Sequence, residues 1–335
     1  MVHGDDFITT GNREDIKWLA GRLSSRFEVK TTVIGDQAGE VKEAKVLNRV
    51  IRRTEEGWEY EADQRHGEIM VQAMGLQEGK GVTTPGEGEK PWMLEEESKP
   101  LNAAAAVGYR ALAARANYLA MDRADIQYAT KEVCREMSAP TTGGNRKMKR
   151  LARYLISKPR VVSSFGFQGE PGEVLGYSDS DWAGCKRTAR STSGGVLMVG
   201  EHCLKSWSST QKSVTLSSGE AELVAAVKCC TEVLGLIQLA GDWGLDMEGR
   251  VMVDSSAAVG IATRKGNGKL RHVKVGQLWI QEKVGEEELK VEKVRGEENP
   301  ADLMTKHLAA AKVEEHMKKI GQGYRTGRSE VSLRL

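Results

Sequence analysis

Four acidic residues stand where their side chains could meet in one site. Asp179 and Asp254 each end an apolar segment that is typical of a β-strand, whereas Glu222 and Asp302 lie at the starts of predicted helices. Ligands collect at the carboxyl ends of strands in an α/β sheet, so the two aspartates converge if their strands are neighbours. Crowded carboxylates repel one another unless a divalent cation is bound. The four acids therefore predict a metal-binding site.

The chemistry that such a site suggests is hydrolysis of phosphodiesters. In a two-metal mechanism, one ion activates the attacking water and a second, about 4 Å away, stabilises the leaving oxygen. Carboxylate oxygens are hard ligands that suit Mg²⁺ or Mn²⁺ better than Zn²⁺. We therefore expect two Mg²⁺ ions, or Mn²⁺ in their place, as cofactors.

Two of the four acids have to be weighed against simpler explanations. Ser217 and Glu220 fit a capping box, so Glu220 is explained as a helix-start residue and Glu222 is the better ligand. Asp302 follows the pair Asn299-Pro300, which is typical of a helix start, and an acid in a first turn complements the helix dipole without any catalysis. From the local sequence alone, both interpretations of Asp302 stay open.

The elements that position these acids follow from hydrophobic periodicity. Three strands joined as a meander precede the helix that carries Glu222, and strands and helices alternate after it. The order βββαβααβα predicts an α/β fold, with a mixed five-stranded sheet and helices on its faces. The expected strands span residues 173–178, 194–199, 203–208, 250–253 and 288–294, and the expected helices 219–240, 255–263, 270–284 and 300–308.

The first half of the chain is predicted to contain a small α+β unit and a group of helices, separated by a Gly- and Pro-rich segment. The tail is highly charged, and we expect disorder from Gln322 onward. The predicted elements are a hairpin at 2–8, a helix at 12–27 capped by Asn12, strands at 44–51 and 57–62, and helices at 64–74, 101–121, 124–137 and 145–156. The expected units are residues 1–76, a linker at 77–100, a helical connection at 101–160, the α/β domain at 171–308 and the tail at 309–335.

Composition restricts the setting of the protein. Its 335 residues include 49 Lys and Arg against 47 Asp and Glu, a formal charge of +2, so any binding of a polyanion must be local. The five cysteines form no C-x-x-C pair, which argues against a zinc site and a disulfide framework. No apolar run approaches the roughly 20 residues of a membrane span, and no secretory signal is readable. We expect a cytoplasmic or nuclear protein without a membrane partner.

One predicted helix concentrates positive charge on its polar side. A solvated face would explain this charge, and so would contact with a nucleic-acid backbone. The two interpretations differ in the salt dependence that they predict for binding. The cations, all in the helix at 145–156, are Arg146, Lys147, Lys149, Arg150 and Arg153.

Several ordered blocks in the second half closely resemble the ribonuclease H domain of copia-type retrotransposon Pol polyproteins. The resemblance implies a ribonuclease H-like fold and cleavage of the RNA strand of RNA:DNA hybrids. It also implies that the same four acids bind the metal, with Asp181 as the rival of Asp179 for the first position. The blocks are Gly176–Gly184, Arg190–Gly194, Ser206–Ser209, Leu216–Glu222, Val253–Ala258 and Asn299–Lys306.

The resemblance suggests further functional residues. Four polar side chains would contact the phosphates, sugars and 2′-OH groups of a hybrid, although Ser and Thr in turns also make local hydrogen bonds. His272 matches a histidine block of the family and is better explained as a half-buried helix residue than as a proton-transfer group. Trp207 is expected in the core, and His307 could assist product release. The four polar residues are Ser191, Thr192, Ser193 and Gln211.

The first half resembles the same family. Val2–Asp6 looks like the paired-aspartate turn of the reverse transcriptase palm, with Asp5 and Asp6 as its acids and His3-Gly4 in place of bulky residues. This implies that residues 1–76 are a remnant of the palm and thumb. We therefore expect a missing upstream portion of the polyprotein as a partner and no DNA synthesis by this chain alone. Having lost partner strands, residues 1–75 are expected to be the least stable part.

The leading hypothesis is thus an endonuclease that cuts RNA:DNA hybrids, attached to a truncated reverse transcriptase. The alternative is a catalytically inactive transposon relic that only binds nucleic acid. An integrase of the same fold family would need a final Glu on a helix after its second Asp, whereas the pattern here ends in Asp302.

Overall fold

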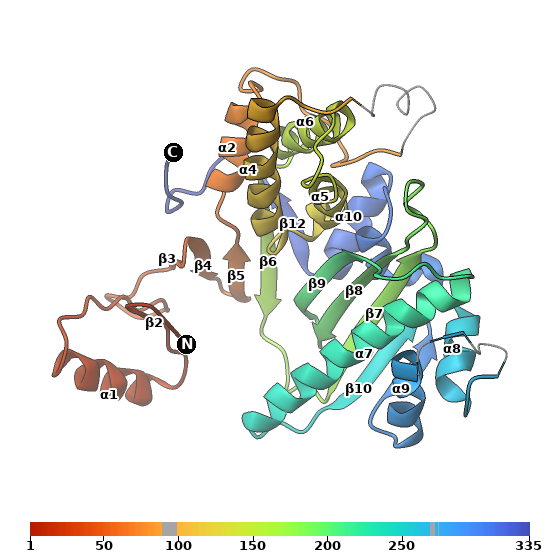
Figure 1. Cartoon of the computed structure of the whole chain (residues 1–335). Helices are drawn as coiled ribbons and strands as arrows, with labels where there is room; N and C mark the ends of the chain where they lie inside the picture. Colours follow the sequence, from red (N-terminus) through yellow and green to blue (C-terminus); the bar gives the residue numbers. More distant parts are fainter. Residues whose placement is uncertain (89–98, 269–271, 274) are drawn as a thin grey trace.

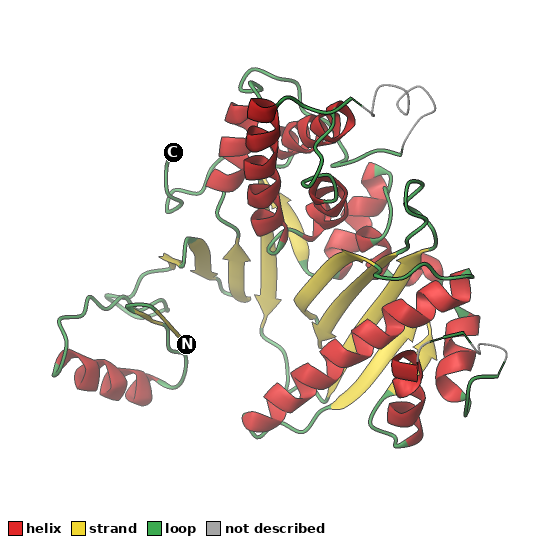
Figure 2. Ribbon diagram, in the orientation of Figure 1, coloured by secondary structure: helices red, strands yellow, loops and turns green. Residues whose placement is uncertain are grey.

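The computed structural model describes residues 1–88, 99–268, 272–273 and 275–335. Two five-stranded sheets, with helices around them, form the framework of this part of the chain (Figure 1). Figure 2 shows one long helix, α7 (Ser218–Asp242), crossing the strands of the first sheet.

The first sheet has the strand order β11-β10-β7-β8-β9. β7, β8 and β9 form an antiparallel meander, and β10 and β11 run parallel to β7. This mixed sheet is the ribonuclease H-like arrangement that was predicted. Its strands span Glu173–Asp181 (β7), Thr192–Val199 (β8), His202–Thr210 (β9), Glu248–Val253 (β10) and Lys290–Lys293 (β11).

Both faces of this sheet are covered, because residues of β8 alternate between two apolar clusters. Leu197 and Val199 pack into a cluster shared with α7, whereas Val196 and Met198 pack into a cluster shared with η3 (Pro300–Met304) and α10 (Ala310–Lys319). Strands that are buried on both faces read as continuous apolar runs, which is how this segment appears in the sequence.

Helix α7 (Ser218–Asp242) covers one face, together with α8 (Ser256–Thr263) and α9 (Val275–Gly285). Gly176 on β7 permits its close approach, because a Cβ there would lie 2.6 Å from Cys229 Sγ. Among the described residues, α7 is the one helix long and apolar enough to cross a membrane. Its apolar side chains pack against Val174 and Val251 of the sheet, as those of a core helix do.

The opposite face is covered by the 3₁₀ helix η3 (Pro300–Met304) and by α10 (Ala310–Lys319). The helix predicted at 300–308 is therefore a short 3₁₀ turn, and α10 is a separate helix. The helix predicted at 124–137 is divided into η1 (Ala124–Ile126) and α5 (Gln127–Cys134). The helix predicted at 270–284 begins at Val275, and residues 269–271 and 274 lie outside the described residues.

The second sheet joins segments that are far apart in the sequence. Its order is β12-β6-β5-β4-β3, and all neighbours are antiparallel. The strand at β6 was not predicted. The strand predicted at 44–51 is instead a hairpin, because Leu47 and Asn48 both have positive φ (47° and 67°), as in a type I′ turn. The strands span Glu43–Val46 (β3), Arg49–Arg53 (β4), Gly57–Glu61 (β5), Arg160–Gly166 (β6) and Gln322–Arg325 (β12).

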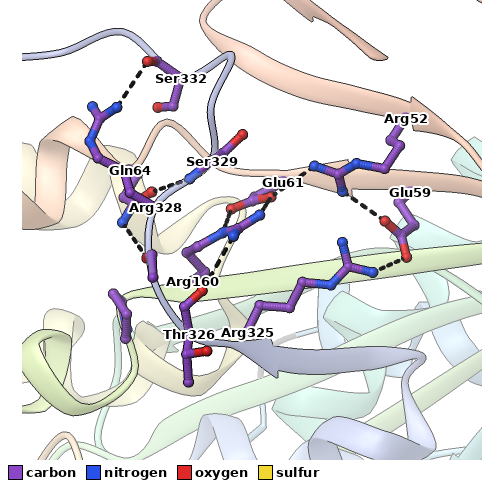
Figure 3. Close-up of polar contacts among 12 residues, drawn as sticks. Arg52, Glu59, Glu61, Gln64, Arg160, Arg325, Thr326, Arg328, Ser329 and Ser332 are labelled. Carbon is purple, nitrogen blue, oxygen red and sulfur yellow. Dashed lines mark hydrogen bonds and ion pairs between the residues drawn. The ribbon is translucent and has the colours of Figure 1, made fainter. Parts of the chain in front are cut away.

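The C-terminal tail is ordered, so the prediction of disorder from Gln322 onward was wrong. After β12, the Gln64 side chain accepts a hydrogen bond from the Ser329 backbone N–H at 3.3 Å (Figure 3). The Arg328 guanidinium donates to Glu68 at 2.7 Å. These partners on and beside helix α2 (Arg65–Ala73) lie about 260 residues away in the sequence, which is why charge composition alone misled the prediction.

A third apolar cluster joins α2 (Arg65–Ala73), α4 (Ala103–Ala120), α5 and α6 (Thr142–Ser157). The second sheet and this cluster together link segments that the sequence analysis assigned to separate units. By contrast, residues 1–42 contain no buried residue. They form the hairpin β1–β2 (Val2–His3 and Asp6–Phe7) and helix α1 (Arg13–Ser24), which Asn12 caps as predicted.

Candidate metal centre

Three of the four predicted acids meet at one end of the first sheet. The parallel register of β7 and β10 pairs Ser178 with Val253, so Asp179 and Asp254 stand at the same level of adjacent strands. Glu222 reaches them from the start of α7. One carboxylate oxygen from each residue lies within 4.8 Å of the other two. The structure therefore gathers oxygen ligands at the strand ends.

Burial and mutual repulsion disfavour three negative charges at this position. Asp179 is 2% and Glu222 7% exposed. Burial, together with the charges of Asp179 and Asp254, raises the pKa of Glu222 to about 9, and burial also raises the pKa of Asp179 and of Asp254. Glu222 Oε1 accepts a hydrogen bond from Ser180 N–H (3.1 Å), but its buried Oε2 has no partner among the described residues. A bound cation would relieve both the repulsion and the unpartnered oxygen.

Asp302 lies beside this group, and its carboxylate is paired with a lysine. Lys306 Nζ is 2.8 Å from Asp302 Oδ1 and 3.9 Å from Asp179 Oδ2, so the ammonium is near both carboxylates. Burial acts to lower the pKa of Lys306, but Asp179 and Asp302 outweigh it and the pKa is raised. The ammonium thus supplies positive charge at the edge of the acidic group.

The 3₁₀ helix η3 is fixed to the sheet by its first residues. The Asn299 side chain caps η3 by accepting from Ala301 N–H (3.1 Å), and it donates to the Ser178 carbonyl on β7 (2.9 Å). Asn299 and Pro300 do form the helix start that was predicted. That start is anchored next to Asp179. Asp302 can therefore complement the helix dipole and still lie at the metal-binding site.

Two further residues of this segment were missed by the sequence analysis. Thr305 donates a hydrogen bond from its hydroxyl to Asp179 Oδ2, and Lys306 pairs with Asp302. Gly194 on β8 allows the contact, since a Cβ there would lie 2.6 Å from Thr305 Cγ2. Both residues belong to the block Asn299–Lys306, so the block itself was the available signal.

The two rival acids lie outside the group of three. Asp181 is half-exposed at the end of β7 and is not one of the grouped acids. Glu220 accepts a hydrogen bond from Leu216 N–H (2.9 Å) and lies 3.0 Å from His272 Nε2. His272 is exposed in a turn before α9, so its prediction as a half-buried helix residue was wrong.

Comparisons with known proteins identify the relatives of this chain. No family model matches it. It is 27% identical over 325 residues to the retrovirus-related Pol polyprotein from transposon TNT 1-94 of Nicotiana tabacum, covering 94% of this chain and 24% of that protein. It is 29% identical over 331 residues to the Pol polyprotein from transposon RE1 of Arabidopsis thaliana, covering 96% of this chain and 21% of that protein. Over almost its whole length, the chain is similar to copia-type retrotransposon Pol polyproteins.

The chain spans about a quarter of the length of the curated relatives that it matches. Among solved structures, LC11-RNase H1, isolated from compost, is 22% identical and covers 40% of this chain and 93% of its own, with a TM-score of 0.32.

The polar residues expected to contact a hybrid are buried in this structure. Ser191, Thr192, Ser193 and Gln211 are each at most 4% exposed. Lys131 Nζ donates to Thr192 (2.8 Å), and Gln211 Nε2 donates to Ser193 (3.0 Å). These side chains are used for internal hydrogen bonds, and their direct contact with phosphate or sugar stays a prediction.

Cations of α6 also have partners within the chain. Lys147 Nζ lies 3.3 Å from Glu136 Oε1, and Arg150 Nη1 lies 3.1 Å from Glu87 Oε1. These pairs hold the segment before residue 89 and the turn after α5 against α6. Lys149 is exposed. Phosphate contact by Arg146, Lys147, Lys149 and Arg150 stays a prediction.

The remaining predicted residues occupy three different settings. Trp207 is 8% exposed and lies in the first core cluster, as expected. His307 packs edge-on against Tyr128, with ring centroids 4.7 Å apart, and burial lowers its pKa to about 4. Asp5 and Asp6 are exposed in the β1–β2 hairpin.

Proposed function

We propose that this chain hydrolyses the RNA strand of RNA:DNA hybrids, using two divalent metal ions at Asp179, Glu222 and Asp254, with Asp302 beside them. The observation that carries the proposal is the meeting of three carboxylates from two adjacent parallel strands and a helix start within 4.8 Å. The relationship to retrotransposon Pol polyproteins supports a nuclease of the ribonuclease H type.

The donor set fits Mg²⁺ or Mn²⁺. All the candidate ligand atoms are carboxylate oxygens, which hard divalent cations prefer. Glu222 Oε2 is already desolvated without a hydrogen-bond partner among the described residues, so an ion would replace no existing bond there. When bound, divalent ions would supply an activated water and stabilise the charge on the leaving oxygen.

The chain's own residues hold the carboxylates in place. Ser180 N–H fixes one oxygen of Glu222, and the Thr305 hydroxyl fixes one oxygen of Asp179. The bond from Asn299 to β7 fixes the segment that carries Asp302. Such preorganisation lets the acids keep their geometry without reorganising during the reaction.

Cleavage of a labelled RNA:DNA hybrid by the purified chain tests this proposal. We expect only the RNA strand to be cut in Mg²⁺, and the variants Asp179→Asn and Asp254→Asn to be inactive. Asp181→Asn is the matched control on the same strand, and it should retain activity because Asp181 lies outside the group. A folded protein that cuts nothing in Mg²⁺ or Mn²⁺ would instead be a catalytically inactive relic, and the proposal would be wrong.

A further inference from the structure

Two loops border the metal-binding acids, and we call them together the rim. Residues 182–190 follow β7, which carries Asp179, and residues 212–217 lead into α7, which carries Glu222. The rim contains no acidic residue, although the whole chain has nearly equal numbers of acids and bases. Its exposed cations are Lys186, Arg187, Arg190 and Lys212. Positive charge is therefore concentrated directly beside the acidic group.

The rim also exposes apolar surface. The exposed fractions are 48% for Trp182, 53% for Val214 and 68% for Leu216. An aromatic ring interleaved with cations is the combination that contacts sugars or bases and phosphates together. Single exposed apolar residues need no explanation, but these three are gathered on the two short loops next to the site.

The two loops are braced against each other. Trp182 Nε1 donates to the Thr215 carbonyl (3.1 Å), so the ring is held while part of its surface stays exposed. The buried Ser191 hydroxyl accepts from Ala183 N–H (3.1 Å) and lies 3.2 Å from the Thr215 hydroxyl. Ser191 thus positions the loops and does not itself reach the surface.

The first loop also contains unfavourable backbone conformations. Ala183 and Ala189 have φ of 54° and 50°, a region that side chains other than glycine rarely adopt. Such strain persists only where the surroundings fix the conformation, and it concentrates at functional sites. A hydrogen bond from Ala189 N–H to the Cys185 carbonyl (2.7 Å) fixes the loop.

Three of the four rim cations are available, in contrast to the paired cations of α6. Within the part of the chain that the structure describes, Arg187, Arg190 and Lys212 have no ion pair or side-chain hydrogen bond. Lys147 and Arg150 of α6 already face Glu136 and Glu87. Binding of a polyanion at the rim would therefore be more favourable than binding at α6, because Arg187, Arg190 and Lys212 have no acidic partner among the described residues that must first be displaced.

We propose that the rim is the docking surface for the nucleic-acid substrate. Trp182 contacts its sugars or bases, and Arg187, Arg190 and Lys212 contact its phosphates, so that one strand passes over Asp179, Glu222 and Asp254. This inference rests on the proposed function and adds the surface that holds the RNA:DNA hybrid.

The test is binding of a fluorescently labelled RNA:DNA hybrid to the full chain in EDTA, measured by anisotropy at several salt concentrations. For Arg187→Gln/Arg190→Gln we expect weaker binding, with the slope of log affinity against log salt reduced by about 1 for each arginine. The matched control is Lys17→Gln/Arg26→Gln, which removes the same charge from exposed cations in and just after α1. It should bind like the unmodified chain.

A second pair of variants tests the aromatic contact. Trp182→Leu should weaken binding roughly tenfold with an unchanged salt slope, because it removes stacking and no charge. The control is Trp243→Leu, at the far end of α7 and 71% exposed. The arginine variants leave the bond between Trp182 and Thr215 intact, so they test the rim even if Trp182→Leu disturbs the loops.

The outcomes separate this inference from the proposed function. Suppose that the unmodified chain binds and cuts the hybrid but both rim variants bind as their controls do. The proposal that the rim docks the substrate is then refuted, and the proposed nuclease activity stands. If the unmodified chain neither binds nor cuts the hybrid, both proposals fail.

Discussion

Glu222→Gln should stabilise the metal-free protein, even though it removes a metal ligand. The carboxylate of Glu222 is 7% exposed and faces Asp179 and Asp254, so its charged form is strongly disfavoured in the folded state. A glutamine has nearly the same shape and can still accept the hydrogen bond from Ser180 N–H, but it carries no charge to be buried.

The size of the effect follows from the pKa of Glu222. Folding raises this pKa from an ordinary 4.5 to about 9. The native state therefore binds a proton that the unfolded state releases, and stability falls as pH rises from about 4.5 to about 9. At pH 7 the loss is roughly 3 kcal/mol, since one pKa unit corresponds to about 1.4 kcal/mol. Glu222→Gln should remove this loss.

Urea unfolding in EDTA between pH 4.5 and pH 9 measures the difference between the variant and the unmodified chain. We expect little difference at pH 4.5 and a growing advantage of the variant above it. Glu220→Gln is the matched control on the same helix. Burial acts to raise the pKa of Glu220, but Leu216 N–H and His272 outweigh it and the pKa is lowered, so this variant should lose stability above the ordinary pKa.

A stability difference between Glu222→Gln and the unmodified chain that does not change with pH would refute the reasoning. It would mean that Glu222 is ionised in the folded state without a metal. The reasoning would also be refuted if Glu222→Gln were less stable than the unmodified chain at pH 8. The packing lost in the variant would then outweigh the relief of the buried charge.

Three other predictions concern the framework. Arg123→Met should cost roughly 3–5 kcal/mol in urea unfolding, because Arg123 and Asp125 form an ion pair 2.6 Å apart with both residues at most 2% exposed. The buried charge of Asp125 would lose its ionic partner and keep the hydrogen bond from the Tyr154 hydroxyl; a second change, Asp125→Leu, should recover part of the loss. Deleting residues 322–335 should speed amide exchange in β5 and β6 but not in β7 and β10. Among the described strands, β12 pairs with β6 alone, at the edge of the second sheet. Equal amide protection with and without the tail would contradict this. Amides of residues 1–42 should exchange fastest of all, because none of these residues is buried; slow exchange there would show contacts that the structure does not contain.

The first sheet is easier to predict from the sequence than the second. Asp179 and Asp254 could be placed together because each ends an apolar strand and because a crossover helix lies between the strands. The parallel pairing is thus a consequence of local pattern and of general rules of connection. The second sheet instead pairs Trp58 with Phe165 and Tyr324 with Val161, and no local pattern specifies such distant partners.

Loops were harder to predict than elements. Ser191, Thr192 and Ser193 have the composition of a surface turn, but β8 begins at Thr192 and its start is covered on both sides. The turn at Leu47-Asn48 lacks the glycine that usually marks a type I′ hairpin, so a single long strand was the natural interpretation. In both cases tertiary packing decides between two readings that the local sequence allows equally.

The structure contains two features that offset the charge of the acids without a divalent ion. Protonation of Glu222 removes one negative charge, and the Lys306 ammonium lies near Asp302 and Asp179. A carboxylate must be ionised to bind a metal, so binding of Mg²⁺ at pH 7 has to release the Glu222 proton. The apparent affinity for the metal should therefore rise with pH until about 9, where the proton is already lost. Charge repulsion among the acids thus couples metal binding to proton release and to stability. Glu222→Gln removes that coupling, because it removes the group that takes up the proton.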